Sequence, residues 1–299
     1  IRTATEAWSC RCLAVDLANS CVDVSRDTNF YYSFLVLSPE KRRAIVAVWD
    51  FCRAVDDAVD EPGKGASLDS VAFNVLRWKS ELECCFGRAT PATEQGRKLK
   101  PIIAHFNLPR QPFDDLLKGV EMDMTQQRYE TFNDLHEYCL RVASTVGLIC
   151  VEIFGYRNEA VKDYATVLGV ALQLTNIIRD ISKDLRNGRI YLPQEDLERF
   201  NVAEADFKNG TSRQMEALLA FQCERARSFY VKSKQLLPLE DARRLVAAEI
   251  MSGIYFAILR RIEHRRHDVF SEIVRVPRWR RALIAIAVWT RVMLGWSVR

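Results

Sequence analysis

The chain has 299 residues, a formal net charge of +4, 48% hydrophobic residues and 27% charged residues. This balance is ordinary for a globular protein, and the length is enough to bury a substantial core. A charge this small argues against a strong polyanion binder. Arginines do crowd residues 260–281, but no RNA-binding motif or zinc-finger spacing accompanies them, so we expect no nucleic-acid partner.

The nine cysteines form no C-x-x-C pair, their number is odd, and several lie in apolar helical patterns. They indicate reduced, buried thiols of a cytoplasmic protein rather than a disulfide framework or a zinc site. No signal peptide is visible. The longest apolar run, 282–296, contains Arg291 and is too short to span a bilayer comfortably, although it could lie on a membrane surface.

Apolar residues recur at helical spacing through nearly the whole chain. Ser38 is suited to cap a helix that has Pro39 in its first turn, an apolar pattern over 44–59, and a loop over 62–67 after it. Further helical patterns cover 69–86, 113–126, 132–154, 159–183, 195–200, 211–237 and 242–264, and Pro277 opens a last basic segment. Because no strand-like alternation appears, the sequence predicts one all-α domain over residues 1–299.

Two acidic clusters stand out. In the first, Asp56 and Asp60 are four residues apart and share one helix face, which Arg53 joins from three residues before Asp56. The second cluster is a stripe at i, i+4 and i+8 formed by Asn176, Asp180 and Asp184.

Apolar residues surround both acidic clusters, although carboxylates at this spacing repel each other and are kept most cheaply in water. This setting indicates a compensating cation. Mg²⁺ takes oxygen ligands and often keeps substrate phosphates in its shell, so two such helices facing each other would hold a diphosphate. One pair alone is more often a chance feature, whereas two pairs accompanied by Asn and Arg weaken that interpretation.

The segments resemble the squalene/phytoene synthase family. Residues 51–60 match its FCR-x-x-D-x-x-x-D motif, and residues 173–193 match its long Q-x-x-N-I-x-R-D-x-x-x-D…RIYLP motif. Residues 138–147 are similar to its YC-x-x-VAG-x-VG motif, with Ser144 at the position of a glycine. The resemblance runs from about residue 29 to 265 and implies an isoprenoid-synthase-type helical bundle around a central cavity.

The resemblance also implies roles for individual residues. Metal binding with Mg²⁺, or Mn²⁺ in its place, would fall to Asp56, Asp60, Asn176, Asp180 and Asp184. Substrate binding would fall to Arg53, Gln173, Asn176, Arg179, Arg189, Tyr191 and Tyr255. Tyr138 would join the four aspartates as a catalytic residue that handles a proton or stabilises a cation.

Simpler interpretations stay open for some of these residues. Tyr138 and Tyr255 could be amphipathic core residues, Arg189 a helix-terminal charge, and Gln173 a satisfied buried amide. Trp49 occupies a position where the family usually has tyrosine, which removes a hydroxyl and puts a phosphate contact in doubt.

Residues 151–156 and 276–280 are similar to the bacterial presqualene diphosphate synthases of hopanoid biosynthesis. This likeness implies head-to-head condensation of two farnesyl diphosphates to presqualene diphosphate, without NADPH. Three alternatives stay open: a phytoene or dehydrosqualene synthase, a head-to-tail elongating enzyme because residues 56–60 read DDxxD, and a non-catalytic helical family member.

The basic, Trp-rich segment at about 275–299 is amphipathic. Besides a solvated helix face, this composition fits contact with a membrane surface, where isoprenoid substrates and products partition. We therefore expect a cytoplasmic protein, with peripheral contact to the inner face of the membrane as an open alternative.

Overall fold

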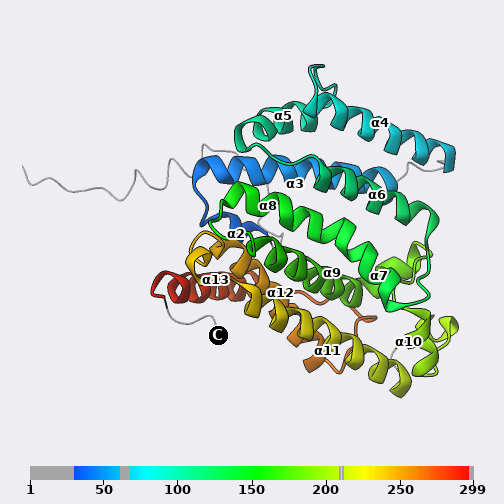
Figure 1. Cartoon of the computed structure of the whole chain (residues 1–299). Helices are drawn as coiled ribbons and strands as arrows, with labels where there is room; N and C mark the ends of the chain where they lie inside the picture. Colours follow the sequence, from blue (N-terminus) through cyan, green and yellow to red (C-terminus); the bar gives the residue numbers. More distant parts are fainter. Residues whose placement is uncertain (1–29, 61–67, 209, 211, 296–299) are drawn as a thin grey trace, which may run out of the picture.

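The computed structural model describes residues 30–60, 68–208, 210 and 212–295, and every regular element in these ranges is a helix (Figure 1). The all-α prediction is confirmed. The predicted loop 62–67 lies outside the described residues. The six cysteines that the structure describes are all free thiols, as expected for a reduced protein.

The helices follow the predicted order with shifts of a few residues at their ends. Their bounds are α2 Tyr31–Phe34, α3 Pro39–Asp60, α4 Leu68–Phe86, α5 Glu94–Phe106, α6 Gln111–Thr125, α7 Phe132–Cys139, α8 Thr145–Phe154, α9 Val161–Arg186, α10 Gln194–Arg199, α11 Arg213–Leu236, α12 Val246–His264 and α13 Arg278–Met293. Short 3₁₀ turns cover Glu204–Lys208 and Leu239–Asp241, and a π-helical turn, η1, covers Leu140–Ser144 between α7 and α8.

Helix α5 was absent from the sequence prediction. Pro101 lies inside it and weakens the helical signal, because proline cannot donate the backbone hydrogen bond. Its start is well defined instead: the Thr93 hydroxyl accepts from the Gly96 amide at 2.9 Å. The buried Glu81 carboxylate in turn accepts from the Thr93 hydroxyl at 2.6 Å and fixes the cap on α4.

Helix α9 lies in the middle of the molecule (Figure 1) and packs on α8, α11, α12 and η1. Its apolar stripe, which includes Leu168, Leu174 and Ile178, is buried. On the other side of α8, helix α3 packs against α4, α5 and α6. The acidic ends of α3 and α9 belong to these two packed groups, so the fold can bring the two acidic clusters together.

The predicted helix over 132–154 is interrupted by the π-helical turn η1, a form that often marks functional sites. Ser144 at the end of η1 donates its hydroxyl to the Thr166 carbonyl of α9 at 2.7 Å. Gly169, one turn further along α9, lies so close that an added Cβ would be 2.6 Å from the Ser144 Cα. Gly169 therefore sets the close approach of α9 to η1.

We predict that Gly169→Ala lowers the free energy of unfolding by roughly 1–3 kcal/mol, because the added methyl meets backbone that must move. Gly253→Ala is the matched control, since its Cβ would meet side-chain methyls and no backbone: one of Ile284 at 3.0 Å and one of Val288 at 3.4 Å. Urea unfolding of both variants measures the effect. Equal stability of the two variants would contradict the argument.

Candidate active site

A polar cavity of about 300 Å³ lies where α3, α6, α7, η1 and α9 meet the segment after α9. Most of the predicted site residues line it: Asp56, Tyr138, Gln173, Asn176, Arg179, Asp180, Asp184, Arg189 and Tyr191. Residues separated by more than one hundred positions in the sequence therefore share one cavity. Their individual roles stay predictions.

Three predicted residues do not appear in this lining. Arg53 points outward, forms an ion pair with Asp57 at 3.5 Å, and lies 5.3 Å over the ring of Trp49. Tyr255 is buried on α12, near the guanidinium of Arg179. Asp60 is the last residue of α3, and its side chain lies outside the described part of the chain.

Opposite charges are paired within the cavity wall. Arg179 Nε donates to Asp180 Oδ1 at 2.8 Å, and both side chains are mostly buried. Burial works against the charge of Arg179, but the hydrogen bonds and charge of Asp180 outweigh it and raise the pKa of the guanidinium. Arg179 therefore keeps its positive charge at any working pH, beside the cavity.

Asn176 offers a buried acceptor to the same cavity. Its amide nitrogen lies 3.4 Å from Gln173 Oε1, whereas its Oδ1 atom is buried and has no hydrogen-bond partner among the described residues. A buried carbonyl oxygen without a donor is costly unless a ligand or a cation satisfies it. Asn176 itself lines the cavity in which the sequence predicted a metal.

The sequence analysis missed Asp123 of α6, which also lines the cavity. Its carboxylate accepts a hydrogen bond from the Tyr138 hydroxyl at 2.9 Å and one from the Tyr191 hydroxyl at 2.7 Å. The two rings stack with centroids 5.2 Å apart. The sequence did contain a signal for Asp123. It lies three residues after Val120, so an acidic residue falls on the buried apolar face of α6.

Burial, and then the charge of Asp123, raise the pKa of Tyr138 and of Tyr191 well above the ordinary range of tyrosine. Both hydroxyls therefore stay protonated and donate to Asp123. Lys183 of α9 also lines the cavity, and the sequence analysis missed it. A lysine among acidic residues is typical of an exposed helix face, so its position gave no signal.

Backbone hydrogen bonds hold the segment after α9 over the cavity. Gly188 has a φ of 77°, which turns the chain at the end of α9. The Ile190 amide then donates to the Gln127 carbonyl at 3.1 Å, and the Gln194 amide donates to the Tyr129 carbonyl at 2.8 Å. These contacts fix Arg189 and Tyr191 at the cavity wall.

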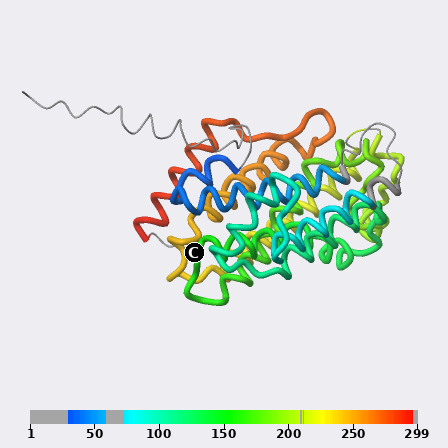
Figure 2. Tube along the Cα trace, turned by 90° about the horizontal axis from the view of Figure 1, so that it is seen from above, coloured from blue at the N-terminus to red at the C-terminus, as the bar shows by residue number. Residues whose placement is uncertain are grey.

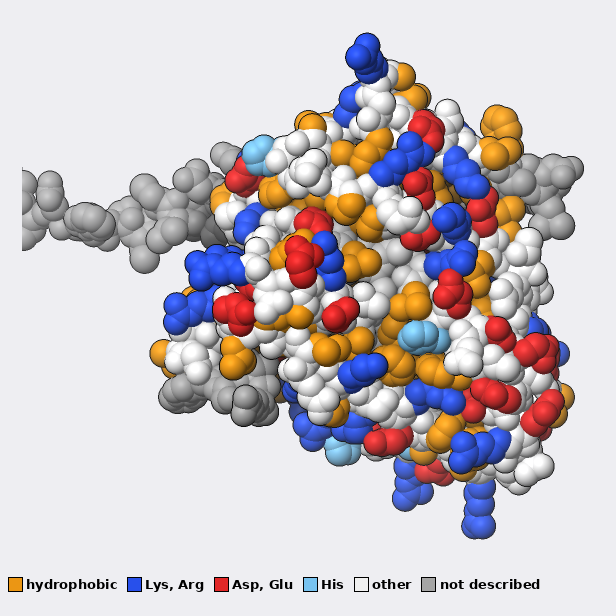
Figure 3. All heavy atoms as spheres, in the orientation of Figure 1, with side chains coloured by type: hydrophobic (Ala, Val, Ile, Leu, Met, Phe, Trp, Pro, Cys, Tyr) orange, Lys and Arg blue, Asp and Glu red, His pale blue; other side chains and the backbone are white. Residues whose placement is uncertain are grey.

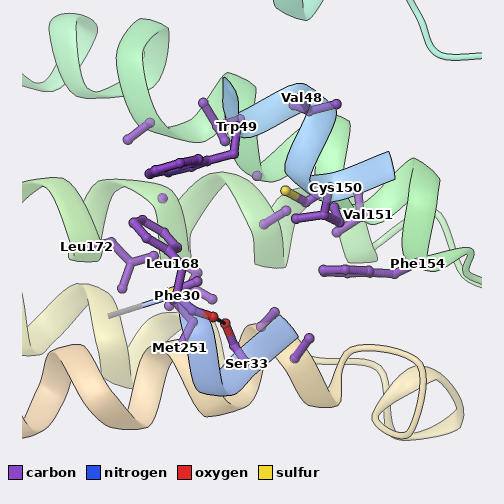
Figure 4. A pocket seen from close by; sticks show the side chains of 18 of the residues that line it. Phe30, Ser33, Val48, Trp49, Cys150, Val151, Phe154, Leu168, Leu172 and Met251 are labelled. Atoms are coloured by element: carbon purple, nitrogen blue, oxygen red, sulfur yellow. Dashed lines mark hydrogen bonds between the residues drawn. The ribbon is translucent and has the colours of Figure 1, made fainter. Parts of the chain in front are cut away.

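A second, apolar cavity of about 120 Å³ lies between α2, α3, α8, α9 and α12 (Figure 4). The rings of Phe30 and Trp49 lie in its wall, together with Leu172 of α9. Gly169 and Leu172 in this wall lie four residues before Gln173 and Asn176 in the polar cavity, so the two cavities follow each other along one face of α9. Burial raises the pKa of Cys150 in the apolar wall to about 12, so this thiol stays neutral.

The geometry defines a helical enzyme site in which paired charges border an apolar cavity. The family model for squalene/phytoene synthase matches residues 24–280, most of the chain. A 15-cis-phytoene synthase of Synechococcus elongatus is 37% identical over 84% of this chain and 85% of its own. A phytoene synthase of Arthrospira platensis is 36% identical over 85% of each chain.

Solved structures agree with the sequence relatives. A dehydrosqualene synthase in complex with a ligand has a TM-score of 0.81 and 28% identity, with 95% of each chain covered. The squalene synthase HpnC of Alicyclobacillus acidocaldarius has a TM-score of 0.69 and 29% identity, covering 80% of this chain and 89% of its own. The chain therefore belongs to the squalene/phytoene synthase family and has its isoprenoid-synthase-type fold. It is a prenyltransferase of the kind that joins isoprenoid diphosphates head to head.

We predict that Asp123→Asn lowers the turnover rate about 100-fold, because an amide oxygen cannot accept from Tyr138 and Tyr191 as the two carboxylate oxygens do. Steady-state kinetics on an allylic isoprenoid diphosphate measures the loss. Tyr129→Phe is the matched control: this neighbouring hydroxyl is buried without a hydrogen-bond partner among the described residues, so its removal should leave the rate near that of the parent. A parent-like rate in Asp123→Asn would contradict the role of the network.

Proposed function

We propose that this chain condenses two farnesyl diphosphates head to head to presqualene diphosphate and releases one diphosphate. One observation supports the proposal above all others: a polar cavity with cationic and acidic walls adjoins an apolar cavity along α9. A prenyl diphosphate has the same division, with a charged head and an apolar tail. The sequence likeness of residues 151–156 and 276–280 to presqualene diphosphate synthases supports the choice of farnesyl.

The reaction needs charge stabilisation around the diphosphate and exclusion of water around the prenyl chain. In one substrate the carbon–oxygen bond breaks, and the electron pair leaves with the diphosphate, whose oxygens Arg179, Lys183 and Arg189 would hold. The double bond of the second substrate attacks the allylic cation, and loss of one proton closes a cyclopropane. The apolar wall around Trp49 and Leu172 would keep water from the cation.

We place proton handling at Tyr138 and Asp123. The Tyr138 hydroxyl is protonated and donates to Asp123, so it presents its oxygen lone pairs to the cavity and has an acceptor behind it. This arrangement would let the Tyr138 hydroxyl accept the proton that the substrate loses, while the original hydroxyl proton passes to the Asp123 carboxylate. None of these steps consumes a reductant, so we propose that the reaction does not use NADPH.

We propose Mg²⁺ as the metal, with Mn²⁺ as a substitute. Asp56, Asp180 and Asp184, together with the orphaned Oδ1 of Asn176, provide the hard oxygen donors that Mg²⁺ prefers. Among the described side chains, no group of three His, Cys, Asp or Glu is placed to hold an ion by itself. Mg²⁺ usually keeps waters and substrate phosphates in its shell, so this finding agrees with binding together with the diphosphate. When bound, the metal neutralises charge on the leaving diphosphate.

A phytoene synthase, which uses geranylgeranyl diphosphate, is the second candidate. The named relatives of Synechococcus elongatus and Arthrospira platensis favour it. Phe30, Phe34 and Trp49 line the small apolar cavity with bulky rings, and we take this lining as support for the shorter farnesyl chain. The single-domain organisation and the cytoplasmic location also stay proposals from the sequence.

We predict that Asp56→Asn lowers diphosphate release about 100-fold and raises the Mg²⁺ concentration needed for half-maximal rate, because one anionic oxygen of the cavity is lost. Asp57→Asn is the matched control. Asp57 is the next residue on α3, but it is exposed, pairs with Arg53, and is absent from the cavity lining. An assay of diphosphate release against Mg²⁺ concentration compares the two variants, and equal losses would refute the assignment.

We predict that the chain with Mg²⁺ and without NADPH converts farnesyl diphosphate to presqualene diphosphate. Mass spectrometry of the products, after phosphatase treatment, identifies the cyclopropyl alcohol. A parallel incubation with geranylgeranyl diphosphate tests the phytoene alternative, and one with added isopentenyl diphosphate tests head-to-tail elongation. Faster conversion of geranylgeranyl diphosphate would overturn the farnesyl assignment, and no diphosphate release from either allylic substrate would favour the non-catalytic alternative.

A further inference from the structure

Helix α13 presents an apolar stripe to solvent. Trp279 is 66% exposed, Leu283 55%, Ile286 60% and Trp289 44%. Positions 279, 283 and 286 follow helical spacing, so their side chains share one face. The two views of the molecule place α13 at one end of the helical bundle (Figures 1 and 2).

The opposite face of α13 is already used for packing. Ala285, Val288 and Val292 are buried, and the helix packs on α12 and α2. Gly253 of α12 lets Ile284 approach closely, since an added Cβ would lie 3.0 Å from the Ile284 side chain. A surface helix normally has one apolar face and one polar face. The outward stripe of α13 is thus not needed for the core.

A basic groove of about 590 Å³ runs beside the stripe, between the end of α12 and the start of α13. Its charged lining is Arg260, Arg261, His264, Arg265, Glu272 and Arg280. Arg265 pairs with Glu272 at 2.6 Å, whereas Arg260, Arg261 and Arg280 form no ion pair within the part of the chain that the structure describes. The face drawn in Figure 3 instead interleaves acidic and basic side chains. The groove is therefore an anion-binding surface next to an exposed apolar one.

We propose that α13 docks the protein on an anionic phospholipid bilayer. The stripe Trp279, Leu283, Ile286 and Trp289 enters the headgroup region, and the arginines of the groove bind lipid phosphates. Charge complementarity selects this occupant, because an apolar stripe beside unpaired arginines matches a surface whose apolar interior lies under negative phosphates. One face of α13 is packed on α2 and α12, so the helix would lie in the interface plane with its outward stripe toward the bilayer. No helix in the described residues is long and apolar enough to cross a membrane.

The docking helix lies close to the apolar cavity. Helix α13 packs on α2 and α12, and both of these helices contribute to the wall of that cavity, through Ser33 and Met251 for example. A bilayer held against α13 would therefore be separated from the cavity by one layer of helices. The proposal itself rests on exposure and charge and does not depend on which prenyl chain the site uses.

Vesicle flotation of the full chain tests the proposal, with phosphatidylglycerol–phosphatidylcholine vesicles compared with pure phosphatidylcholine. We expect the parent to float with the anionic vesicles. Trp279→Ser/Leu283→Ser/Ile286→Ser should bind roughly tenfold or more weakly. Arg260→Gln/Arg261→Gln/Arg280→Gln should lose about fivefold in affinity for each arginine removed, and only on anionic vesicles.

Phe73→Ser/Leu76→Ser is the matched control, since these α4 side chains are 68% and 61% exposed and lie outside both cavity linings. Its flotation should equal that of the parent. Diphosphate release in detergent, unchanged in the stripe variant, would show that the variant is folded. Equal flotation of the stripe variant and the parent would overturn the proposal. A second result would also overturn it: the parent chain does not bind vesicles but forms a dimer, and the stripe variant is a monomer. The stripe would then bind a second copy of the chain.

Discussion

The structure depends on keeping charged groups in a partly buried cavity beside an apolar one. Taking a carboxylate out of water is costly unless a partner compensates it. At the end of α9 the compensation is local, because Arg179 and Asp180 form a pair within one helix turn. Asp56, Asn176 and Asp184 line the same cavity. The fold thus stabilises part of the charge within the chain and gathers further side-chain oxygens around one cavity.

A second polar network secures the far wall of the cavity. Asp123, Tyr138 and Tyr191 come from α6, α7 and the segment after α9, and two hydrogen bonds to one carboxylate join them. The network links three parts of the chain that no local interaction would place together. Both tyrosine hydroxyls are buried, and each donates its hydrogen bond to Asp123. The network can therefore fix the geometry of the cavity wall as well as take part in chemistry.

Helical periodicity predicted most helices and the two acidic clusters, and the resemblance to the family added most of the remaining cavity lining. Asp180 and Asp184 share one face because they lie four residues apart on a helix. The family motif added the other site residues around them. Asp123 was missed because a single acid on an apolar stripe has no companion at helical spacing. Helix α5 was missed because Pro101 masks its pattern, while its start depends on Glu81 from another helix. Spacing placed Arg53 on the face of Asp56 and the family motif implied substrate binding; in the structure Arg53 forms an ion pair with Asp57 and is absent from the cavity lining. Contacts between helices decide the cases of Asp123 and α5, and helical spacing within one element does not contain them. Arg53 and Asp57 instead lie four residues apart on the same helix.

The boundary between the charged and the apolar cavity falls at matching places on two helices. On α3, Trp49 lies in the apolar wall and Asp56 in the polar one, seven residues apart, or about 10 Å along the axis. On α9, the change occurs between Leu172 and Gln173 and continues to Asn176 and Asp180. A tyrosine at position 49 would add a hydroxyl to the apolar side of this boundary. Tryptophan instead supplies a broad apolar surface, with Arg53 stacked over its ring from the solvent side. Tryptophan at position 49 therefore keeps a hydroxyl out of the apolar cavity, whereas the polar lining on α3 begins seven residues later at Asp56.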